Sequence, residues 1–459
     1  MGKKQAAKSG GLNDLLPVGG EADVVVIGSG TSGIAASIAA SRKGAEVILI
    51  ERFPFVGGMS TLIPVACWPL NTAVETGELD MPYDGILGEI RDRMKALNAI
   101  DLRTLQEGVD KLIGIADDND RMATSKWYLF DPEALKYLYF DMLREAGVKL
   151  RVNSLVVDTI VRDNKIEAIV VETLTRRELI KGKIFIDCTG SADVVTRAGS
   201  EAALGTGDND GVPAGLMIPS STTFRIAGVD TDNIDLDEVG KIYEQHRLKG
   251  EINVPFEGFF PHIVCKGVIQ IFGTRVFDIN PLDPEKAALG EMEQRRQVRD
   301  ITNFLKKEIP AFHDCQLINT GMSIGMIGTR RIRGDYFITQ QDIIDARKFE
   351  DAIAAGTYKL EVWETDGANA HFHHIVGTWY TIPFRALLPK GLQNVIVAGS
   401  CISGQIIAMA TWAVMPMCYK TGQAAGTAAS LCIKGNAGPR DISVAELQRI
   451  LRLDGVFLG

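Results

Sequence analysis

The segment from Val24 to Arg52 constrains the fold of this chain most strongly; it reads VVVIGSGTSGIAASIAASRKGAEVILIER. A short β-branched run at 23–28 ends in glycine, and the small-residue segment 31–43 has the composition of a helix that stops at Gly44. Residues 46–50 form a second apolar run, which predicts a second strand. The segment therefore predicts a strand–helix–strand unit with glycines at the first turn.

The three glycines of this turn have the spacing of a dinucleotide-binding fingerprint. Gly28 allows the tight turn, Gly30 lets the backbone approach a diphosphate, and Gly33 lets the helix pack closely on the strand. The start of the helix, at Thr31 and Ser32, points backbone N–H groups at the diphosphate and stabilises its charge. The position of the motif, directly after a strand and opening a helix, predicts dinucleotide binding.

A carboxylate follows the second strand, at Glu51. In this position a carboxylate accepts hydrogen bonds from ribose hydroxyls and repels a 2′-phosphate, which disfavours NADP. The glycine pair shortly afterwards is not needed by an NAD dehydrogenase, but it suits a longer cofactor that passes close to the backbone. An ordinary glycine loop is the alternative for the pair. The residues predicted to contact the cofactor here are Glu51, Arg52, Gly57, Gly58, Met59 and Ser60.

Several further segments have regular patterns. Residues 131–146 begin with Asp-Pro and end before Gly147, which predicts a helix. The apolar runs that follow are separated by a hairpin-type turn at Asp163-Asn164, and they predict a β-meander that returns to a buried strand at 183–187. The remaining predictions are helices at 285–308 and 408–433 and a buried strand at 392–398.

Four stretches of the chain, in order, resemble the FAD-dependent oxidoreductase family of the glutathione-reductase-like flavoprotein superfamily. They are GSGTSG with the later GGMST, FIDCTGSADVVTRAG at 185–199, RRIRGDYFITQQDI at 330–343, and YTIPFRALLPKGLQNVIVAGSCIS with AVMPMCYKTGQAAGTAA at 380–429. The resemblance implies an α/β fold: a Rossmann-like FAD-binding domain, with a parallel sheet and a β-meander, and an inserted α+β substrate domain.

Domain boundaries follow from this resemblance and from shifts in composition. We expect a flexible N-terminal tail at 1–20 and a discontinuous FAD-binding domain at 21–204 and 381–459, with an insert at about 76–120. We expect the substrate-binding domain at 205–380, where glycine, proline and aromatic residues increase.

The resemblance also implies that FAD is held by segments from both ends of the chain. It places adenine beside the backbone at Leu155–Val156, and it places a helix N-terminus after Gly399 at the pyrimidine edge of the flavin, where it stabilises negative charge. The further cofactor contacts that it implies are Val156, Thr189, Gly190, Gly399, Ser400 and Met415.

The chain departs from the family pattern beside the predicted flavin. The family has Gly-Arg where this chain has Gly399-Ser400, and it has a His-Glu pair where this chain reads Ile406-Ile407. An arginine of the family corresponds to Ala413. Substrate class and catalytic residues therefore cannot be carried over at these positions.

Histidine is the first candidate for handling the substrate proton, because its charge changes near neutral pH. His371, His373 and His374 are three of the six histidines, and strand alternation would place His371 and His373 on one face. A catalytic or substrate contact, a metal pair, and a surface or packing role all remain open for this cluster.

Arg331, with Arg330 and Arg333, is a candidate for binding a substrate carboxylate or reduced flavin. The alternative is a structural salt-bridge network with Asp335 or Asp342. Tyr380 is a candidate phenol donor near the flavin, and its alternative is packing in the core. The predicted catalytic residues are His371, His373, Arg331 and Tyr380.

Cysteine spacing and charge limit the classes of partner. None of the seven cysteines forms a CxxC pair, which argues against a zinc or iron–sulfur site, and we predict no metal cofactor. Cys67 and Cys188 are expected to be small buried residues, and a covalent flavin link or a redox thiol is the alternative for Cys67. The net charge of −9 argues against a nucleic-acid partner, including an RNA-modifying role. The N-terminus has no apolar signal core, and the apolar run Ile406–Tyr419 is too short to span a bilayer, so we expect a cytoplasmic protein.

These features predict an FAD-dependent dehydrogenase that transfers hydride from a small organic substrate to flavin N5 and uses a separate electron acceptor, oxygen or a redox protein. Two alternatives stay open: reduction of an activated C=C bond, and a non-catalytic FAD-binding subunit of a larger complex. The sequence does not fix the direction of the reaction, because the surroundings of the flavin set its potential. A homo-oligomer is compatible with the sequence.

Overall fold

The main sheet joins strands from both ends of the chain. The computed structural model describes residues 16–63, 67–71, 84–104, 125–207, 215–255, 259–325, 328–363, 370–373, 375 and 378–459. The sheet has the order β6-β2-β1-β9-β8-β7, with β20 also paired to β9. Its parallel strands are β1 (Val18–Ile27), β2 (Val47–Ile50), β6 (Lys149–Arg151), β9 (Arg177–Asp187) and β20 (Val395–Val397). The C-terminal part of the chain thus completes a sheet that the N-terminal part begins.

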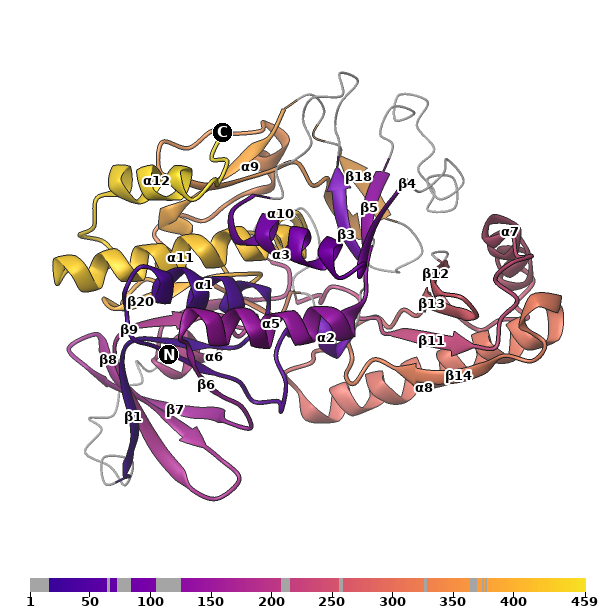
Figure 1. Ribbon diagram of the computed structural model, residues 1–459, viewed down its shortest axis with the longest axis horizontal. Helices are drawn as coiled ribbons and strands as arrows, with labels where there is room; N and C mark the ends of the chain where they lie inside the picture. The colour runs from indigo at the N-terminus through magenta and orange to yellow at the C-terminus, as the bar shows by residue number, and fades with distance from the viewer. Residues whose placement is uncertain are drawn as a thin grey trace.

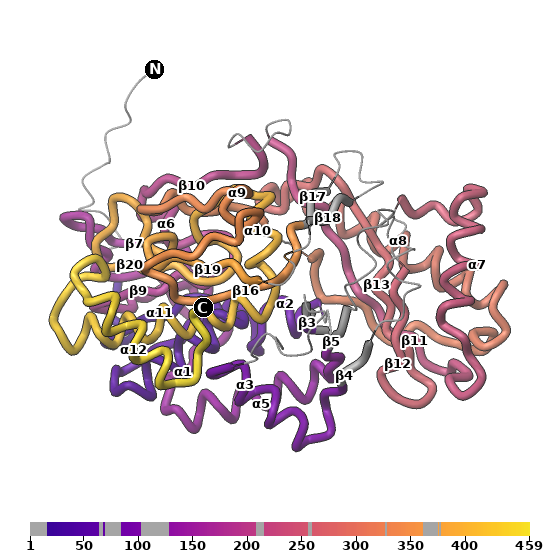
Figure 2. Tube along the Cα trace, turned by 90° about the horizontal axis from the view of Figure 1, so that it is seen from above, coloured from indigo at the N-terminus to yellow at the C-terminus, as the bar shows by residue number. Residues whose placement is uncertain are grey.

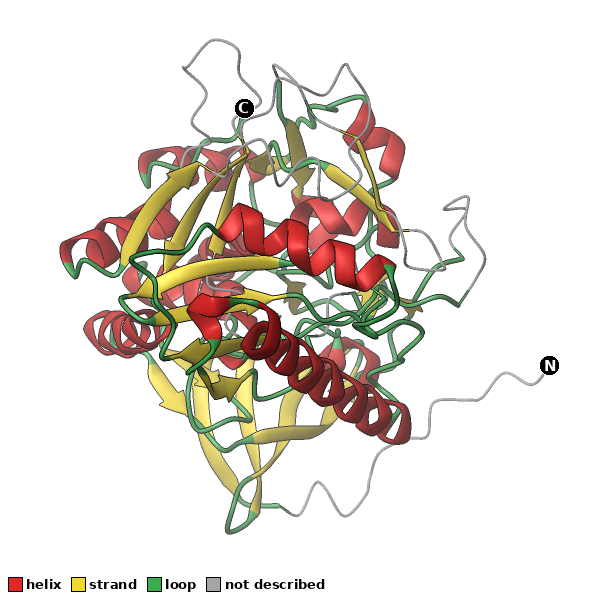
Figure 3. Ribbon diagram, turned by 90° about the vertical axis from the view of Figure 1, so that its right-hand side faces the viewer, coloured by secondary structure: helices red, strands yellow, loops and turns green. Residues whose placement is uncertain are grey.

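The predicted β-meander is confirmed. Strands β7 (Leu155–Arg162) and β8 (Lys165–Glu172) pair antiparallel with each other, and β8 pairs with β9. At the hairpin turn, Asp163 and Asn164 have positive φ angles of 48° and 60°, the primed geometry that matches the twist of the strands. Strands β7 and β8 form the lower end of the molecule in Figures 1 and 3.

Helices α1 (Thr31–Arg42) and α11 (Met415–Gly435) pack on this sheet and on each other, and α5 (Pro132–Ala146) packs against α1. Helix α1 is buried on nearly every side, because it lies between the sheet and α11 (Figure 1). Asp131 caps α5 and Gly147 ends it in the left-handed conformation, as the sequence predicts. The other helices around this core are α2 (Met59–Leu62), α3 (Gly85–Ala96), α6 (Asp193–Arg197), α10 (Ile406–Trp412) and α12 (Val444–Leu453).

A second unit has its own hydrophobic core at the other end of the molecule (Figures 1 and 2). Its antiparallel sheet has the order β12-β13-β11-β14, and the long helix α8 packs along one face. Its core residues run from Phe224 to Cys315. The elements are β11 (Thr223–Ala227), α7 (Leu236–Leu248), β12 (Phe260–Cys265), β13 (Val268–Phe272), α8 (Pro284–Glu308), η2 (Pro310–Phe312) and β14 (Gln316–Thr320).

The other described strands form short sheets. They are β10 (Ala202–Leu204) with β15 (Arg330–Ile332), β16 (Ala352–Gly356) with β19 (Tyr380–Pro383), β17 (Leu360–Trp363) with β18 (Ala370–His373), and β3 (Cys67–Asn71) with β5 (Ser125–Phe130) and β4 (Ile100–Thr104). Helices α9 (Gln340–Ile344) and η3 (Phe384–Leu387) complete this part. Figure 2 shows β17 and β18 between the first core and the four-stranded sheet.

The packing favours a narrower inserted unit than 205–380. Ile332, Ile353 and Tyr380 belong to the first core, and only residues from about Phe224 to Cys315 build the second one. The predicted domain boundaries remain a prediction. At the N-terminus, residues 1–15 lie outside the described residues, while Val18–Gly20 already belong to β1, so the expected tail at 1–20 is too long.

The predicted single helix at 408–433 is wrong, because the chain forms α10 and α11 instead. Val414 between them is extended, with φ −64° and ψ 144°. Pro416 lies in the first turn of α11, where its missing N–H leaves no hydrogen bond broken, and it could not continue a helix from α10. In the part of the chain that the structure describes, no helix has the length and apolar character needed to cross a membrane.

Candidate functional site

The carboxyl ends of the parallel strands lie at one level. Ile27 pairs with Ile50 and with Asp187, and Asp187 pairs with Val397. The Gly28 backbone N–H donates to Ile50 O at 2.8 Å, and the N–H of Ala398 donates to Asp187 O at 3.0 Å. The loops after four strands therefore start side by side, and α/β sheets bind their ligands outside this edge.

Two glycines of the first loop are sterically required. Gly28 has a positive φ of 93°, and a Cβ there would lie 2.5 Å from Cys188 O. A Cβ on Gly33 would lie 1.8 Å from Gly28 O. Any other residue at either position would push the loop, the helix and the strand apart.

Gly30 has a different role, because its backbone is extended and a Cβ there would meet nothing nearer than Gly58 Cα at 4.0 Å. The space beside Gly30 lies at the N-terminus of α1, where no side chain caps the helix. A side chain at this position would fill that space without a clash inside the protein. Open space in front of uncapped helical N–H groups fits a diphosphate.

Glu51 is buried and holds the first loop to the loop after β2. Its Oε2 accepts hydrogen bonds from Ser29 N at 2.9 Å and Ser29 Oγ at 2.6 Å, and its Oε1 accepts one from Phe53 N at 2.9 Å. Arg52 is exposed, and its guanidinium lies 4.9 Å from the centre of the Phe53 ring. The structure thus gives Glu51 a loop-organising role that sequence reasoning missed.

The glycine pair lies directly over the first loop. Gly57 N donates to Ser29 O at 2.8 Å, and a bridge pairs Gly57 with Gly30. Gly58 has a φ of 54°, and a Cβ on it would lie 2.8 Å from Gly30 Cα. The close approach of the two backbones requires Gly58, and Gly57 is required by its φ of 117° and by Thr61, whose Oγ1 would lie 2.5 Å from a Cβ.

Met59 and Ser60 open α2 immediately after the pair. Ser60 Oγ donates to Gly57 O at 2.7 Å and lies 3.4 Å from the hydroxyl of Tyr139. Tyr139 in turn is hydrogen-bonded to Tyr419 on α11, and burial raises the pKa of Tyr139 to about 12. No local sequence signal marks this tyrosine pair, since its members are far apart in the chain.

Val156 is buried near the start of β7. The segment before it is tied to the acidic loop, because Glu51 N donates to Arg151 O at 2.8 Å and Ser154 N donates to Glu51 O at 2.9 Å. The predicted adenine contact, Val156, therefore follows a segment that is hydrogen-bonded to Glu51.

The loop after β9 is organised by a buried carboxylate, Asp187. Its Oδ1 accepts from the backbone N and the Oγ1 of Thr189 at 3.0 and 2.7 Å, and its Oδ2 accepts from Val194 N and Val195 N at 2.9 and 3.1 Å. Burial raises the pKa of Asp187. The carboxylate thereby holds the turn around Thr189 to the start of α6.

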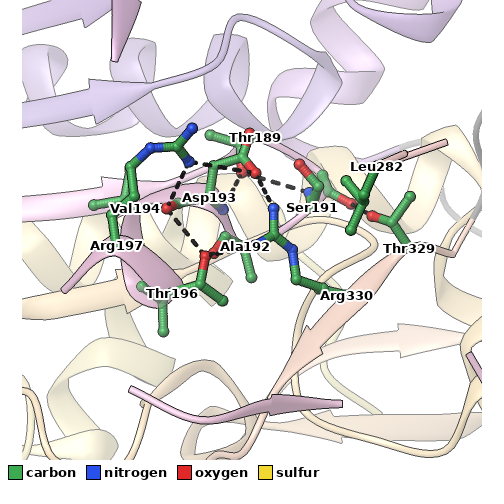
Figure 4. A network of polar contacts seen from close by, with 12 residues as sticks. Thr189, Ser191, Ala192, Asp193, Val194, Thr196, Arg197, Leu282, Thr329 and Arg330 are labelled. Carbon is green, nitrogen blue, oxygen red and sulfur yellow. Dashed lines mark hydrogen bonds and ion pairs between the residues drawn. The ribbon is translucent and has the colours of Figure 1, made fainter. Parts of the chain in front are cut away.

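Figure 4 shows the second fixation of this turn, by Arg330. Its guanidinium donates to Asp193 Oδ1 at 2.5 Å and to Thr196 Oγ1 at 2.9 Å. Gly190 O beside them accepts from Ser400 Oγ at 3.3 Å, which joins the loop after β9 to the loop after β20. The two halves of the predicted cofactor site therefore meet at Gly190 and Ser400.

Gly399 packs between two helices. Its φ is 90°, and a Cβ would lie 2.7 Å from Ser32 Oγ on α1. Its N–H donates to Thr421 Oγ1 on α11 at 3.1 Å. Helix α11 starts at Met415 without a side-chain cap, so its first N–H groups are not satisfied by a capping side chain. These features fit an elongated anionic cofactor along the sheet edge, as the sequence predicts for FAD.

Two predicted catalytic residues are buried in structural positions. Arg331 is fully buried and donates to Gly404 O and to Gly205 O, each at 2.8 Å. Tyr380 is fully buried, and its hydroxyl donates to Thr411 O at 2.8 Å. Both geometries favour the structural alternative: core packing for Tyr380, and backbone cross-linking for Arg331.

The backbones of His371 and His373 lie on β18, opposite Val362 and Leu360 of β17. Their side chains, His374, and the side chain of Cys67 lie outside what the structure describes. The catalytic role of the histidines stays a prediction. Cys188 is a buried thiol whose pKa is raised by burial, as expected of a small packing residue.

The structure gives partners for Arg330 and for the two carboxylates of the alternative salt-bridge network. Asp335 pairs with Arg440 and Asp342 with Arg347, while Arg330 pairs with Asp193. The capping box of Thr339 and Asp342 at α9 is confirmed.

Comparison with curated proteins finds short similarities. An NADH:fumarate oxidoreductase of Klebsiella pneumoniae (strain 342) is 48% identical over 56 residues, which are 12% of this chain and 6% of that protein. A probable fumarate reductase of Shewanella frigidimarina (strain NCIMB 400) is 29% identical over 189 residues, 36% of this chain and 32% of that protein. The chain thus spans about a third or less of the length of these curated relatives.

Among solved structures, a geranylgeranyl bacteriochlorophyll reductase-like protein from Thermoplasma acidophilum is 13% identical with a TM-score of 0.48 and covers 95% of this chain and 85% of its own. A family model described as FAD dependent oxidoreductase matches residues 23–451, nearly the whole chain. The glycine turn, Glu51 and the loops that meet at Gly190 and Ser400 all lie within that match. This chain therefore belongs to the FAD-dependent oxidoreductase family, and its cofactor is FAD.

Proposed function

We propose that this protein dehydrogenates a small organic substrate and passes the electrons to a separate acceptor, oxygen or a redox protein. The observation that best supports this proposal is the join between the second unit and the cofactor loop. Met322 N, just after β14, donates to Leu62 O at the end of α2, at 2.8 Å. A module with its own core thus abuts the segment that follows the glycine pair, which suits a substrate-holding unit.

The join is tightly packed. A Cβ on Gly321 would lie 2.5 Å from Thr222 Oγ1 and 3.3 Å from Ile63 Cγ2. Ile63 and Thr222 are almost fully buried. Such packing keeps water from this side of the site, which limits side reactions of a reactive intermediate.

FAD, when bound, supplies a hydride acceptor at flavin N5. Gly30 and the N-terminus of α1 would hold the diphosphate, Ser400 and Met415 would lie at the isoalloxazine end, and the second unit would hold the substrate. The proton released by the substrate needs a base, and we propose His371 or His373 on β18 for this role, since imidazole accepts a proton near neutral pH.

Anaerobic titration of the purified holoprotein tests the reaction. Alcohols, amines and saturated acids are added singly, and the visible flavin absorbance is followed until air is admitted. We expect at least one donor class to bleach the flavin and air or an added acceptor to restore it. A flavin that stays oxidised with every donor would contradict the proposal and favour a non-catalytic FAD-binding subunit.

A second candidate reaction is the reduction of an activated C=C bond. It is favoured by the curated relatives, which are named as fumarate reductases or a fumarate oxidoreductase. Dithionite-reduced holoprotein, mixed anaerobically with fumarate, separates the two directions. Rapid reoxidation by fumarate supports the reductase, and no reoxidation by fumarate combined with bleaching by a donor supports the dehydrogenase.

A further inference from the structure

The four-stranded sheet of the second unit has two different faces. Phe224, Ile226, Ile269 and Ile271 belong to the core that includes α8. Because side chains alternate along a strand, the residues between them project from the opposite face. That face is the one turned away from α8. Figure 2 shows β17 and β18 between the four-stranded sheet and the first core.

The register places a row of polar residues across this opposite face. Gln270 of β13 lies between Arg225 of β11 and His262 of β12, and Asn319 of β14 lies on the other side of Arg225. Gln270 is only 1% exposed. A polar face of an antiparallel sheet normally meets water, but here the middle of the row is covered, while Asn319 at the edge strand is exposed.

A second row lies nearer the cofactor loop. It contains Thr223, Phe272 and Phe260, which are cross-strand partners. The two phenylalanine rings are 6.1 Å apart. Thr223 is nearer that loop than Arg225, because the preceding residue, Thr222, lies at the join with α2. Two residues along a strand separate the rows by about 7 Å.

Arg225 lies in the first row, between Gln270 and Asn319. Its Nε donates to Gln270 Oε1 at 2.9 Å, which fixes the plane of the guanidinium. Its Nη2 is buried and has no hydrogen-bond partner, and within the described ranges no carboxylate pairs with it. By contrast, Arg247 pairs with Glu244, and Arg296 pairs with Glu293. A buried guanidinium N–H without an acceptor is unfavourable, so a site with this geometry suits an incoming anion.

We propose that Arg225, oriented by Gln270, binds a carboxylate of the substrate, and that the flat apolar body of the same molecule lies on Phe260 and Phe272 toward the flavin. This inference rests on the proposed function and names its substrate class: small unsaturated or aromatic carboxylic acids. Guanidinium and carboxylate match as planar bidentate partners, and the approximately 7 Å between the rows suits a carboxylate and the reacting carbon of one small molecule.

Calorimetric binding to the oxidised holoprotein tests the inference without turnover. Benzoate, fumarate and cinnamate are the probes, and benzamide is the uncharged match to benzoate. We expect at least one carboxylate to bind, and benzamide to bind at least about 10-fold more weakly than benzoate, since a charged hydrogen bond is lost. Equal binding of benzoate and benzamide, or no binding of any of the three carboxylates at millimolar concentration, overturns the inference.

Two variants locate the site. Arg225→Gln should lower the affinity for the tightest-binding carboxylate about 10- to 100-fold. Arg247→Gln, which removes a paired arginine on α7, should leave its affinity unchanged. FAD content and the midpoint of thermal unfolding report the folding of each variant.

If Arg225→Gln retains FAD and binds carboxylates as tightly as the wild type, Arg225 is not the carboxylate anchor. This conclusion holds even where a donor reduces the flavin. If the carboxylate affinity depends on Arg225 but no donor reduces the flavin, the proposed reaction fails and the anchor stands. Should Arg225→Gln lose FAD, Arg225→Lys decides: it keeps the charge but not the bidentate geometry. A weaker carboxylate complex at full FAD content supports the anchor, and an unchanged one contradicts it.

Discussion

Glu51 combines two tasks in one buried side chain. Its oxygens accept three hydrogen bonds from the protein itself, from Ser29 N, Ser29 Oγ and Phe53 N. A carboxylate has about four lone-pair sites, so capacity remains for the ribose hydroxyl that the sequence predicts. The residue therefore shapes the loop that receives the diphosphate and also offers a contact to the adenosine end.

Glu51→Gln should weaken FAD binding about 10-fold or more. The amide NH₂ would face donors at Ser29 or Phe53 instead of accepting from them, and a charged hydrogen bond contributes about 1.5–3 kcal/mol. Fluorescence titration of the apoprotein with FAD measures the change. Glu46→Gln is the matched control, because Glu46 is exposed and pairs with the surface residue Lys149. Equal affinity for FAD in both variants would contradict this role of Glu51.

The glycines of the first turn should separate folding from cofactor binding. Gly30→Ala adds a Cβ that meets no atom nearer than 4.0 Å, so the apoprotein should unfold at the wild-type temperature. FAD should nevertheless bind less tightly, because the methyl group occupies the space beside the N-terminus of α1.

Gly33→Ala is the matched variant, with its Cβ 1.8 Å from Gly28 O. It should lower both the unfolding temperature and the FAD content, since overpacking destabilises by about 1–3 kcal/mol. Scanning calorimetry of the apoproteins and titration with FAD measure the two effects. Normal FAD affinity in Gly30→Ala would show that the diphosphate does not pass there.

Whether the role of a residue could be predicted depends on how far apart in the sequence its contacts lie. The fingerprint glycines were predictable, because their steric needs arise from the strand–turn–helix unit itself. Arg331 and Tyr380 were not, because their partners, Gly404, Gly205 and Thr411, are distant in sequence or follow a break that the pattern does not show. The Arg225 row depends on cross-strand register, which also has no local signal.

At the scale of elements, the crossing of α1 and α11 holds the two ends of the chain together. A Cβ on Gly422 would lie 2.1 Å from Ser32 O, and one on Gly426 would lie 2.1 Å from Ala36 O. The helix backbones are therefore in direct contact. This explains why both helices consist largely of glycine, alanine, serine and threonine along their shared surface.

Gly426→Ala should destabilise the protein by about 1–3 kcal/mol, because the added methyl forces α11 away from α1. Denaturant unfolding of the holoprotein measures the loss. Gly435→Ala, at the end of the same helix, is the control, since its Cβ would meet only Ala437 Cβ at an ordinary 3.8 Å. Equal stability of the two variants would contradict the backbone contact.

A buried ion pair fixes α11 to α3. Lys420 Nζ lies 3.2 Å from Asp84 Oδ2, which also accepts from Phe457 N at 2.9 Å. Both side chains are almost fully buried. Burial raises the pKa of Asp84 and lowers the pKa of Lys420, so each group is stabilised in its charged form mainly by the other.

Lys420→Met should cost about 3–5 kcal/mol at neutral pH, because it leaves the Asp84 carboxylate buried without a cation. The folded-state pKa of Asp84 lies above its unfolded value, so protonation favours the folded state. The difference from wild type should therefore shrink as the pH falls through the folded-state pKa. Denaturant unfolding at several pH values measures it, with exposed Lys434→Met as control. A difference that grows toward acid would contradict this account.

At the scale of the whole molecule, the protein has two main cores with different contents. The predicted FAD contacts all lie at the sheet edge of the first core, and the residues of the second core run from Phe224 to Cys315. Family resemblance was enough to predict an inserted unit. Its limits were not predictable, because the segment from Ile332 to Tyr380 returns to the first core through contacts with α10 and α11 that no local pattern encodes.

Binding of FAD should therefore protect the two cores unequally. A ligand at about 1,000 times its Kd stabilises the unit that binds it by about 4 kcal/mol. Amide hydrogen exchange with and without FAD should slow most in β1, β9 and β20, whose ends carry the cofactor loops. Exchange in α7 and β12 should change least, and β11 should lie between, since it starts at the join with α2. Equal slowing of exchange in α7 and β1 would contradict this prediction. It would mean that both cores open as one cooperative unit.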